Sequence, residues 1–145
     1  MNTQDIEQMI GYHIGVVSHL IQNKYNKKLS EFDLTIAQAK VLYRLVQNGK
    51  MTQAEIQKRL YIKGSTMNGI IDTMLKRDLI VKEDSKEDRR TKHISLTEKG
   101  EQLERKLWSS VGNLETELVA GFSEEEQKLL VSWLKRLREN LDKNE

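Results

Sequence analysis

The residues of this sequence that could read DNA bases lie close together, with Ser65, Thr66 and Asn68 falling within four positions. An asparagine amide can form paired hydrogen bonds with adenine, and serine or threonine hydroxyls can bond several bases or a phosphate. Such side chains reach base edges only from an element that fits the major groove, which is about 12 Å wide and admits an α-helix. By itself a Ser-Thr pair also fits the start of an ordinary surface helix, so its interpretation depends on the neighbouring segments.

A cationic segment downstream could bind phosphates or the minor groove. Its Lys and Arg residues fall within eleven positions: Lys82, Lys86, Arg89, Arg90 and Lys92. An arginine here could enter a narrow, electronegative minor groove beside the bases that a helix reads. Acidic residues are interspersed with these cations, so the segment alone also fits a solvated surface loop.

Charge is concentrated in the same part of the chain. The whole chain has 24 Lys and Arg against 22 Asp and Glu, a net charge of +2, whereas residues 50–93 contain eleven Lys and Arg against seven Asp and Glu. The middle third therefore carries the positive charge that a nucleic-acid partner requires.

Composition restricts the other function classes. The 145 residues contain no cysteine and three scattered histidines, so we expect no metal site, no cofactor and no thiol chemistry. The sequence has no nucleophile elbow, phosphate-binding glycine loop or metal-ligand helix, and we expect it not to be an enzyme. It shows neither a basic N-terminal leader nor an apolar stretch of roughly 18 residues, which predicts a cytoplasmic protein with no membrane partner.

The apolar periodicity predicts the elements that position these groups. Apolar residues at spacings of three and four indicate helices over about 4–29, 35–48, 52–61, 64–77, 97–118 and 123–141. Thr35, Thr52 and Ser123 each fit the start of a capping box. Residues 79–83 and 92–96 predict a β-hairpin around the charged loop. We therefore predict a mainly α fold with a small β-hairpin wing, in which a helix-turn-helix is flanked by long terminal helices.

The span from Leu34 to Gly100 resembles the MarR family of winged helix-turn-helix transcriptional regulators. The resemblance rests on Leu34-Thr35, Thr52-Gln53-Ala54-Glu55-Ile56, Ser65-Thr66-Met67, Asp72, Asp88-Arg89-Arg90 and Ile94-Ser95-Leu96-Thr97-Glu98-Lys99-Gly100. The closing pattern D-x-R-x-x-x-x-x-L-T-x-x-G is specific when it follows a helix-turn-helix. The resemblance implies a regulator, most often a repressor, that binds double-stranded DNA.

The resemblance also assigns residues. The DNA-binding positions are Gln53, Lys63, Ser65, Thr66, Asn68, Lys86, Arg89, Arg90 and Lys92, and Asp72 is expected to pair with the wing arginine, Arg90. Three departures from the family pattern stand out. Lys63 replaces a capping residue, Gly69 replaces a larger polar residue, and Asp78 replaces a turn glycine, although aspartate tolerates a left-handed backbone.

The apolar stripes of the terminal helices predict a homodimer. They are too extensive for one small winged domain to cover, and a second copy would bury them. We therefore predict a helical dimerisation region, 1–33 and 97–145, and a winged helix-turn-helix DNA-binding region, 34–96. A two-fold dimer would place two recognition helices about one turn of DNA apart, which predicts a pseudo-palindromic operator.

The resemblance further implies a pocket for a small aromatic or amphipathic effector between these two regions. Its expected lining residues are Tyr12, His13, Val16, His19, Leu45 and Trp108. His13 lies on an apolar stripe and fits a buried core histidine better than a ligand-binding one, and Trp108 fits a packing residue equally well.

One alternative function stays open, that of a winged-helix adaptor that binds other proteins without binding DNA. An adaptor would form salt-insensitive protein complexes, whereas phosphate contacts make DNA affinity fall steeply with salt.

Overall fold

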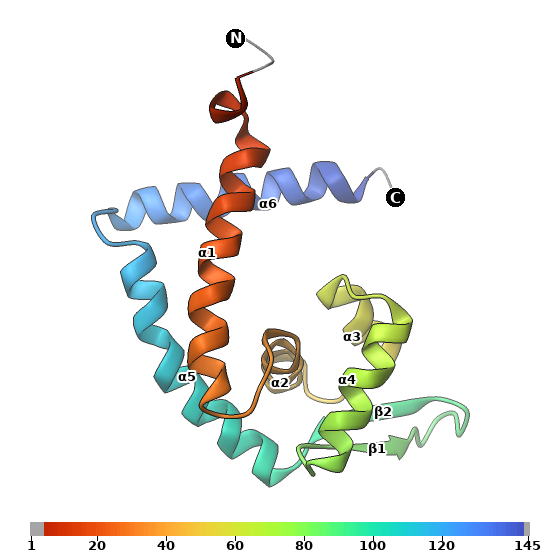
Figure 1. Ribbon diagram of the computed structural model, residues 1–145. Helices are drawn as coiled ribbons and strands as arrows, with labels where there is room; N and C mark the ends of the chain where they lie inside the picture. The colour runs from red at the N-terminus through yellow and green to blue at the C-terminus, as the bar shows by residue number, and fades with distance from the viewer. Residues whose placement is uncertain (1–4, 144–145) are drawn as a thin grey trace. The chain divides into compact units, whose positions relative to one another are not determined.

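The computed structural model describes residues 5–143, and this part of the chain is mainly helical with one two-stranded antiparallel sheet (Figure 1). The elements in order are η1 (Ile6–Gln8), α1 (Ile10–Ser30), α2 (Ile36–Asn48), α3 (Gln53–Leu60), α4 (Gly64–Lys76), β1 (Ile80–Asp84), β2 (Lys92–Leu96), α5 (Glu98–Leu118) and α6 (Glu124–Asp142). The predicted mainly α fold with a hairpin wing is confirmed. The first helix differs, since Ile6–Gln8 form the separate turn η1 and α1 begins at Ile10, and the predicted start at residue 4 lies outside the described residues.

Local hydrogen bonds fix where the helices begin. The Thr35 hydroxyl accepts from the Gln38 N–H at 3.2 Å, and the Gln38 side chain accepts from the Thr35 N–H at 3.1 Å, which confirms the predicted capping box. Ser123 and Glu126 form the same reciprocal pair. Only one of the two hydrogen bonds of the capping box predicted at Thr52 is formed. The Thr52 hydroxyl accepts from the Glu55 N–H at 3.1 Å, but the Glu55 side chain is exposed and accepts no bond from the Thr52 N–H within the described chain.

The core lies where α2, α3, α4 and the hairpin meet. Its largest fully buried side chains are Leu42, Ile56, Met67, Ile71, Met74, Leu79, Ile80 and Ile94. Leu29 of α1 and Leu107 of α5 join the same cluster. Burial of Met67 and Met74 confirms that the methionines of α4 are core residues, and this fixes which face of α4 remains in solvent.

The hairpin is attached to the helical core at its base. β1 and β2 pair from Ile80 with Leu96 to Asp84 with Lys92. Met51, just before α3, adds an isolated bridge to Ile94, with N–O distances of 3.0 and 2.7 Å. The hairpin projects away from α5 (Figure 1).

A glycine is required where the wing passes into α5. The Thr97 N–H donates to the Leu79 carbonyl at 3.1 Å, and the Thr97 hydroxyl caps the Gly100 N–H at 3.0 Å. A Cβ at position 100 would lie 2.1 Å from the Leu79 carbonyl oxygen. Only glycine lets the first turn of α5 lie this close to the backbone that precedes β1.

The chain forms two compact units, residues 1–111 and 112–145. In the first unit, α1 and the first part of α5 contribute to the core of the winged domain, while the second unit contains the end of α5 and all of α6. These units do not coincide with the dimerisation and DNA-binding regions expected from the sequence, and that functional division stays a prediction.

Apolar side chains remain exposed along the terminal helices of the single chain. They include Ile10, Ile14, Val17 and Leu20 on α1, and Leu130, Val131, Trp133, Leu134 and Leu141 on α6. His13 is exposed as well, with its Nε2 2.7 Å from the Glu7 carbonyl oxygen. The interpretation of His13 as a buried core histidine is therefore wrong for the single chain.

Candidate nucleic-acid interface

Helix α4 presents a polar face at its N-terminal end. Met67, Ile71 and Met74 are fully buried, and this fixes the rotation of the helix about its axis. Ser65, Thr66 and Asn68 are consequently exposed. These three predicted base-reading residues occupy the first two turns, where a helix entering a major groove contacts base edges.

The N-terminus of α4 also has unsatisfied backbone donors. Lys63 is the N-cap residue and forms no side-chain cap. The first N–H groups of the helix therefore lack the acceptor that Ser, Thr or Asp would supply, and a phosphate could take that place. A cation beside a helix N-terminus is unfavourable when no anion is present, but the Lys63 ammonium would attract the same phosphate.

Two predicted contact residues from different helices are bonded to each other. The Gln53 Nε2 at the start of α3 donates to the Asn68 Oδ1 of α4 at 2.5 Å. This bond uses one of the two lone pairs of the Asn68 oxygen and leaves the amide N–H groups of Asn68 available as donors. A hydrogen bond therefore links the amide side chains of α3 and α4 within the helix-turn-helix.

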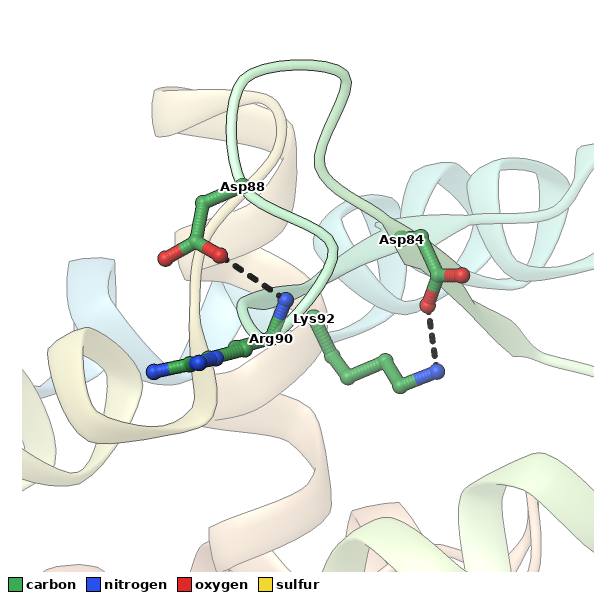
Figure 2. A network of polar contacts seen from close by, with 4 residues as sticks. All are labelled: Asp84, Asp88, Arg90 and Lys92. Carbon is green, nitrogen blue, oxygen red and sulfur yellow. Dashed lines mark hydrogen bonds and ion pairs between the residues drawn. The ribbon is translucent and has the colours of Figure 1, made fainter.

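The wing loop is shaped by Asp88 (Figure 2). Its Oδ1 accepts from the Arg90 backbone N–H at 3.0 Å, and its Oδ2 accepts from the Thr91 hydroxyl at 3.3 Å. At the end of the strand pair, the Lys92 ammonium forms an ion pair with Asp84. The side chains of Arg90 and Lys92 extend in opposite directions in this view.

The wing cations differ in whether their side chains have an ion-pair partner. The side chains of Lys86, Arg89 and Arg90 are exposed and make no hydrogen bond or ion pair with the residues that the structure describes. Lys92 is engaged with Asp84, but both side chains are more than half exposed, so the pair is weak and a phosphate could compete for the lysine.

The expected ion pair between Asp72 and Arg90 is not formed among residues 5–143. Asp72 is exposed on α4, and neither side chain has an ion-pair partner there. The hairpin is instead held at its base by the Met51–Ile94 bridge and by Lys50, whose ammonium lies 3.7 Å from Glu83. The wing-supporting role of Asp72 therefore stays a prediction.

Arg77 anchors the C-terminal end of α4. Its guanidinium donates to the Asp33 carbonyl at 2.5 Å and the Phe32 carbonyl at 3.2 Å, both in the corner between α1 and α2. The Lys99 ammonium of α5 donates to the Arg77 carbonyl at 2.9 Å. The next residue, Asp78, adopts a left-handed backbone with φ 58°, as expected for its position in the turn. The sequence analysis did not identify Arg77, because its partners are backbone carbonyls.

A cavity of about 200 Å³ lies between α1, α2 and α5. It is lined by Tyr25, Leu29, Ile36, Ala39, Lys40, Tyr43, Glu104, Leu107, Trp108 and Val111. The rings of Tyr43 and Trp108 are stacked, with centroids 5.8 Å apart and planes inclined by 11°. The lining is mostly apolar and aromatic, which is typical of small-molecule sites.

The cavity includes one of the six expected effector-site residues. Trp108 lines it, whereas Leu45 lines a second hollow that shares Glu104 with the first. Tyr12, His13, Val16 and His19 lie on the exposed part of α1 and line neither space. Sequence reasoning missed Tyr25, Tyr43 and Glu104, although Glu104 was detectable as a carboxyl at helical spacing from Leu107 and Val111.

Comparison with known proteins places this geometry in a family. The family model described as "MarR family" matches residues 34–92. The chain is 32% identical over 121 residues to an HTH-type transcriptional regulator of Bacillus cereus, covering 83% of this chain and 80% of that protein. It is 31% identical to the HTH-type transcriptional regulator YwaE of Bacillus subtilis, covering 78% of this chain and 66% of YwaE. The chain belongs to the MarR family.

A solved structure is similar to nearly the whole of this chain. A MarR-family transcriptional regulator of Listeria monocytogenes, solved in complex with a 26mer DNA, superposes with a TM-score of 0.87 at 27% identity, covering 94% of this chain and 91% of that one. The present protein is accordingly a MarR-family transcriptional regulator and not an enzyme.

Two further features of this regulator concern residues 5–143. No helix within residues 5–143 is long and apolar enough to span a membrane. No group of three or more potential metal ligands is found in the same range.

Proposed function

We propose that this protein is a homodimeric, sequence-specific DNA-binding regulator that represses transcription by occupying a pseudo-palindromic operator. The observation that carries the proposal is the arrangement of α4 and the wing. The exposed Ser65, Thr66 and Asn68 lie on a helix whose other face is buried in the core. The neighbouring hairpin carries Arg89 and Arg90, whose side chains have no partner among residues 5–143. Such an arrangement suits a helix in the major groove and a wing in the adjacent minor groove.

The exposed apolar residues on α1 and α6 support the dimer. Soluble monomers rarely leave large contiguous apolar patches in water, and a second copy of the chain would cover such residues. The aromatic cavity between α1, α2 and α5 supports control by a small effector, because it lies beside the corner that Arg77 connects to α4. A cytoplasmic location, where such a regulator meets DNA, belongs to the same proposal.

The first experiment measures DNA binding by fluorescence anisotropy on the promoter upstream of the protein's own gene. A scrambled duplex of equal length and composition is the control, and both are titrated at about 0.15 M salt, where non-specific binding is weak. We expect nanomolar affinity for an operator within the promoter or within fragments selected from the genome. Failure to prefer any genomic fragment over the scrambled duplex would overturn the proposal and favour the adaptor function.

The dimer is tested separately by sedimentation equilibrium of the purified chain. We expect a mass twice the 16.9 kDa of the chain. A monomer at micromolar concentration would contradict the dimer even if the protein binds DNA.

A further inference from the structure

Tyr61 adopts a backbone conformation that tyrosine disfavours. Within residues 5–143 three non-glycine residues have a positive φ, namely Asp33 at 54°, Tyr61 at 55° and Asp78 at 58°. Aspartate tolerates the left-handed region better than most residue types, whereas a bulky side chain is rarely found there. Residues held in such conformations cluster at functional sites, so the tyrosine calls for an explanation.

The turn between α3 and α4 explains the backbone of Tyr61 but not its side chain. The N–H groups of Tyr61 and Ile62 both donate to the Gln57 carbonyl, the second of them at 3.3 Å. This pattern ends a helix through one left-handed residue, for which glycine or asparagine suffices. Ile62 packs against the core, whereas Tyr61 is 61% exposed. Neither the turn nor the core therefore requires an aromatic ring at position 61.

Tyr61 lies next to the polar end of α4. Gln53 of α3 is bonded to Asn68 of α4. One turn further along α3, the Gln57 amide lies beside Gly64, where a Cβ would be 3.5 Å from the amide nitrogen and oxygen. These contacts between the two helices converge on the turn that contains Tyr61. When the N-terminal end of α4 enters a major groove about 12 Å wide, the chain leading into the helix passes the phosphates at the edge of that groove.

The charge around Tyr61 is positive. Lys58, Arg59 and Lys63 lie within three positions of it and are exposed, and no Asp or Glu occurs between residues 56 and 66. Lys58 and Arg59 also suit the C-terminal end of α3 by themselves, where cations are favourable. Together with Lys63 they make this end of the helix-turn-helix a surface that attracts phosphate. A phenol hydroxyl can donate a hydrogen bond to a phosphate oxygen.

We propose that Tyr61 contacts DNA, with its phenol hydroxyl donating to a backbone phosphate beside the groove that α4 enters. Such a contact fixes the position of α4 on the duplex and does not read a base. The inference rests on the proposed DNA-binding function and adds a positioning residue to it. Tyrosine is then kept in an unfavourable backbone conformation for the contact that its side chain makes with DNA.

Two substitutions in the full-length protein separate the hydroxyl from the backbone conformation. Tyr61→Phe removes only the hydroxyl. Tyr61→Asn removes the ring and supplies a residue that tolerates the left-handed backbone. Tyr12→Phe is the matched control, because it removes a phenol hydroxyl from α1, outside the helix-turn-helix.

Fluorescence anisotropy on labelled operator and scrambled duplexes measures the contact over a series of salt concentrations. We expect both Tyr61 variants to bind both duplexes at least about tenfold more weakly, because the bond is made to a charged acceptor that every DNA sequence offers. The slope of log affinity against log salt should keep its wild-type value, since an uncharged phenol releases no counterion. Tyr12→Phe should match the wild type in affinity and slope.

Urea denaturation supplies a readout that a purely structural role would not produce. We expect Tyr61→Asn to unfold at a urea concentration at least as high as the wild type, because the left-handed backbone suits asparagine, even though its DNA affinity falls. A Tyr61→Asn variant that loses stability together with affinity would show that the tyrosine serves the fold, and would overturn the inference.

Two further results would overturn it. One is wild-type DNA affinity in a folded Tyr61→Phe variant, and the other is a loss confined to the operator, which would indicate a base contact. If the wild type prefers no genomic fragment, the proposed function fails, but the scrambled duplex at about 0.05 M salt still tests Tyr61. There, weaker binding of Tyr61→Phe supports the phosphate contact and unchanged binding refutes it.

Discussion

Gln53 and Asn68 belong to different helices, yet their amides share one hydrogen bond of 2.5 Å. The bond affects which polar atoms the pair can offer to a base, because it takes up one lone pair of the Asn68 oxygen and leaves the Asn68 N–H groups available. The two residues should therefore read DNA as a unit.

A double-mutant cycle tests this coupling. Asn68→Ala should cost about 1–3 kcal/mol of binding free energy on the operator and relax the preference for one base pair. In the double variant Gln53→Ala/Asn68→Ala, the loss of binding free energy should be smaller than the sum of the two single losses by at least about 0.5 kcal/mol. Anisotropy titrations on operator and scrambled DNA measure both effects. Additive losses, or equal losses on both duplexes, would show that the amides act separately or contact only the DNA backbone.

Arg90 should contribute through charge. Its guanidinium has no partner within the described chain, so Arg90→Ala should leave folding intact and reduce the slope of log affinity against log salt by about one per subunit. Lys106→Ala, an exposed cation on α5, is the matched control and should leave the slope unchanged. If both variants have the wild-type slope, Arg90 does not meet a phosphate.

Asp88 should matter for the shape of the wing. Asp88→Asn and Asp88→Ala remove the same negative charge, but the asparagine oxygen can still accept from the Arg90 N–H. We expect the alanine variant to bind operator DNA more weakly than the asparagine variant. Equal affinities of the two variants would mean that only the charge of Asp88 counts.

Gly100 should be needed for folding, whereas Gly112 in the same helix should not. Gly100→Ala places a Cβ against the Leu79 carbonyl and should reduce the free energy of unfolding by at least about 1–3 kcal/mol. At Gly112→Ala the new Cβ has no described atom within 4 Å beyond its chain neighbours and the backbone of its own helix, so this variant should stabilise the helix by about 0.5–1 kcal/mol. Urea denaturation of both variants measures the contrast, and a Gly100→Ala protein as stable as the wild type would refute the close approach.

Glu104 should make stability depend on pH. Burial raises its pKa above the ordinary 4.5, so the folded state retains a proton that the unfolded chain releases. The free energy of unfolding should therefore fall as pH rises through the range above 4.5. Glu104→Gln lacks this contribution and should gain stability relative to the wild type between pH 4 and pH 7, while Glu115→Gln should show no such gain. A constant difference across this range, in urea titrations, would contradict the raised pKa.

The exposed polar face of α4 and the wing were predictable because their signals are local. The apolar spacing of α4 fixes which side is buried, and Ser65, Thr66 and Asn68 then face solvent whatever the rest of the chain does. The wing was predictable for a similar reason, since residues 92–96 alternate between apolar and polar types and the turn before them is polar.

The cavity was less predictable because it depends on how separate helices meet. The apolar stripe on α1 has the same sequence pattern whether it faces a pocket or solvent, and the structure places Tyr25 in the cavity lining but leaves Tyr12 and Val16 exposed outside it. The Asp72–Arg90 pair stays a prediction for a related reason, because ion pairs between exposed side chains depend on rotamers that no spacing determines.

The anchor at Arg77 has a consequence for how this sequence can vary. Arg77 donates to the carbonyls of Phe32 and Asp33, which every residue type possesses. Substitutions at these two positions therefore leave the acceptors in place, subject only to the packing of Phe32 and the left-handed backbone of Asp33, φ 54°. Position 77 has no such freedom, because lysine carries a single ammonium and cannot reproduce the planar two-pronged contact. Among close homologues, we expect the residue types at positions 32 and 33 to vary more than the arginine at position 77.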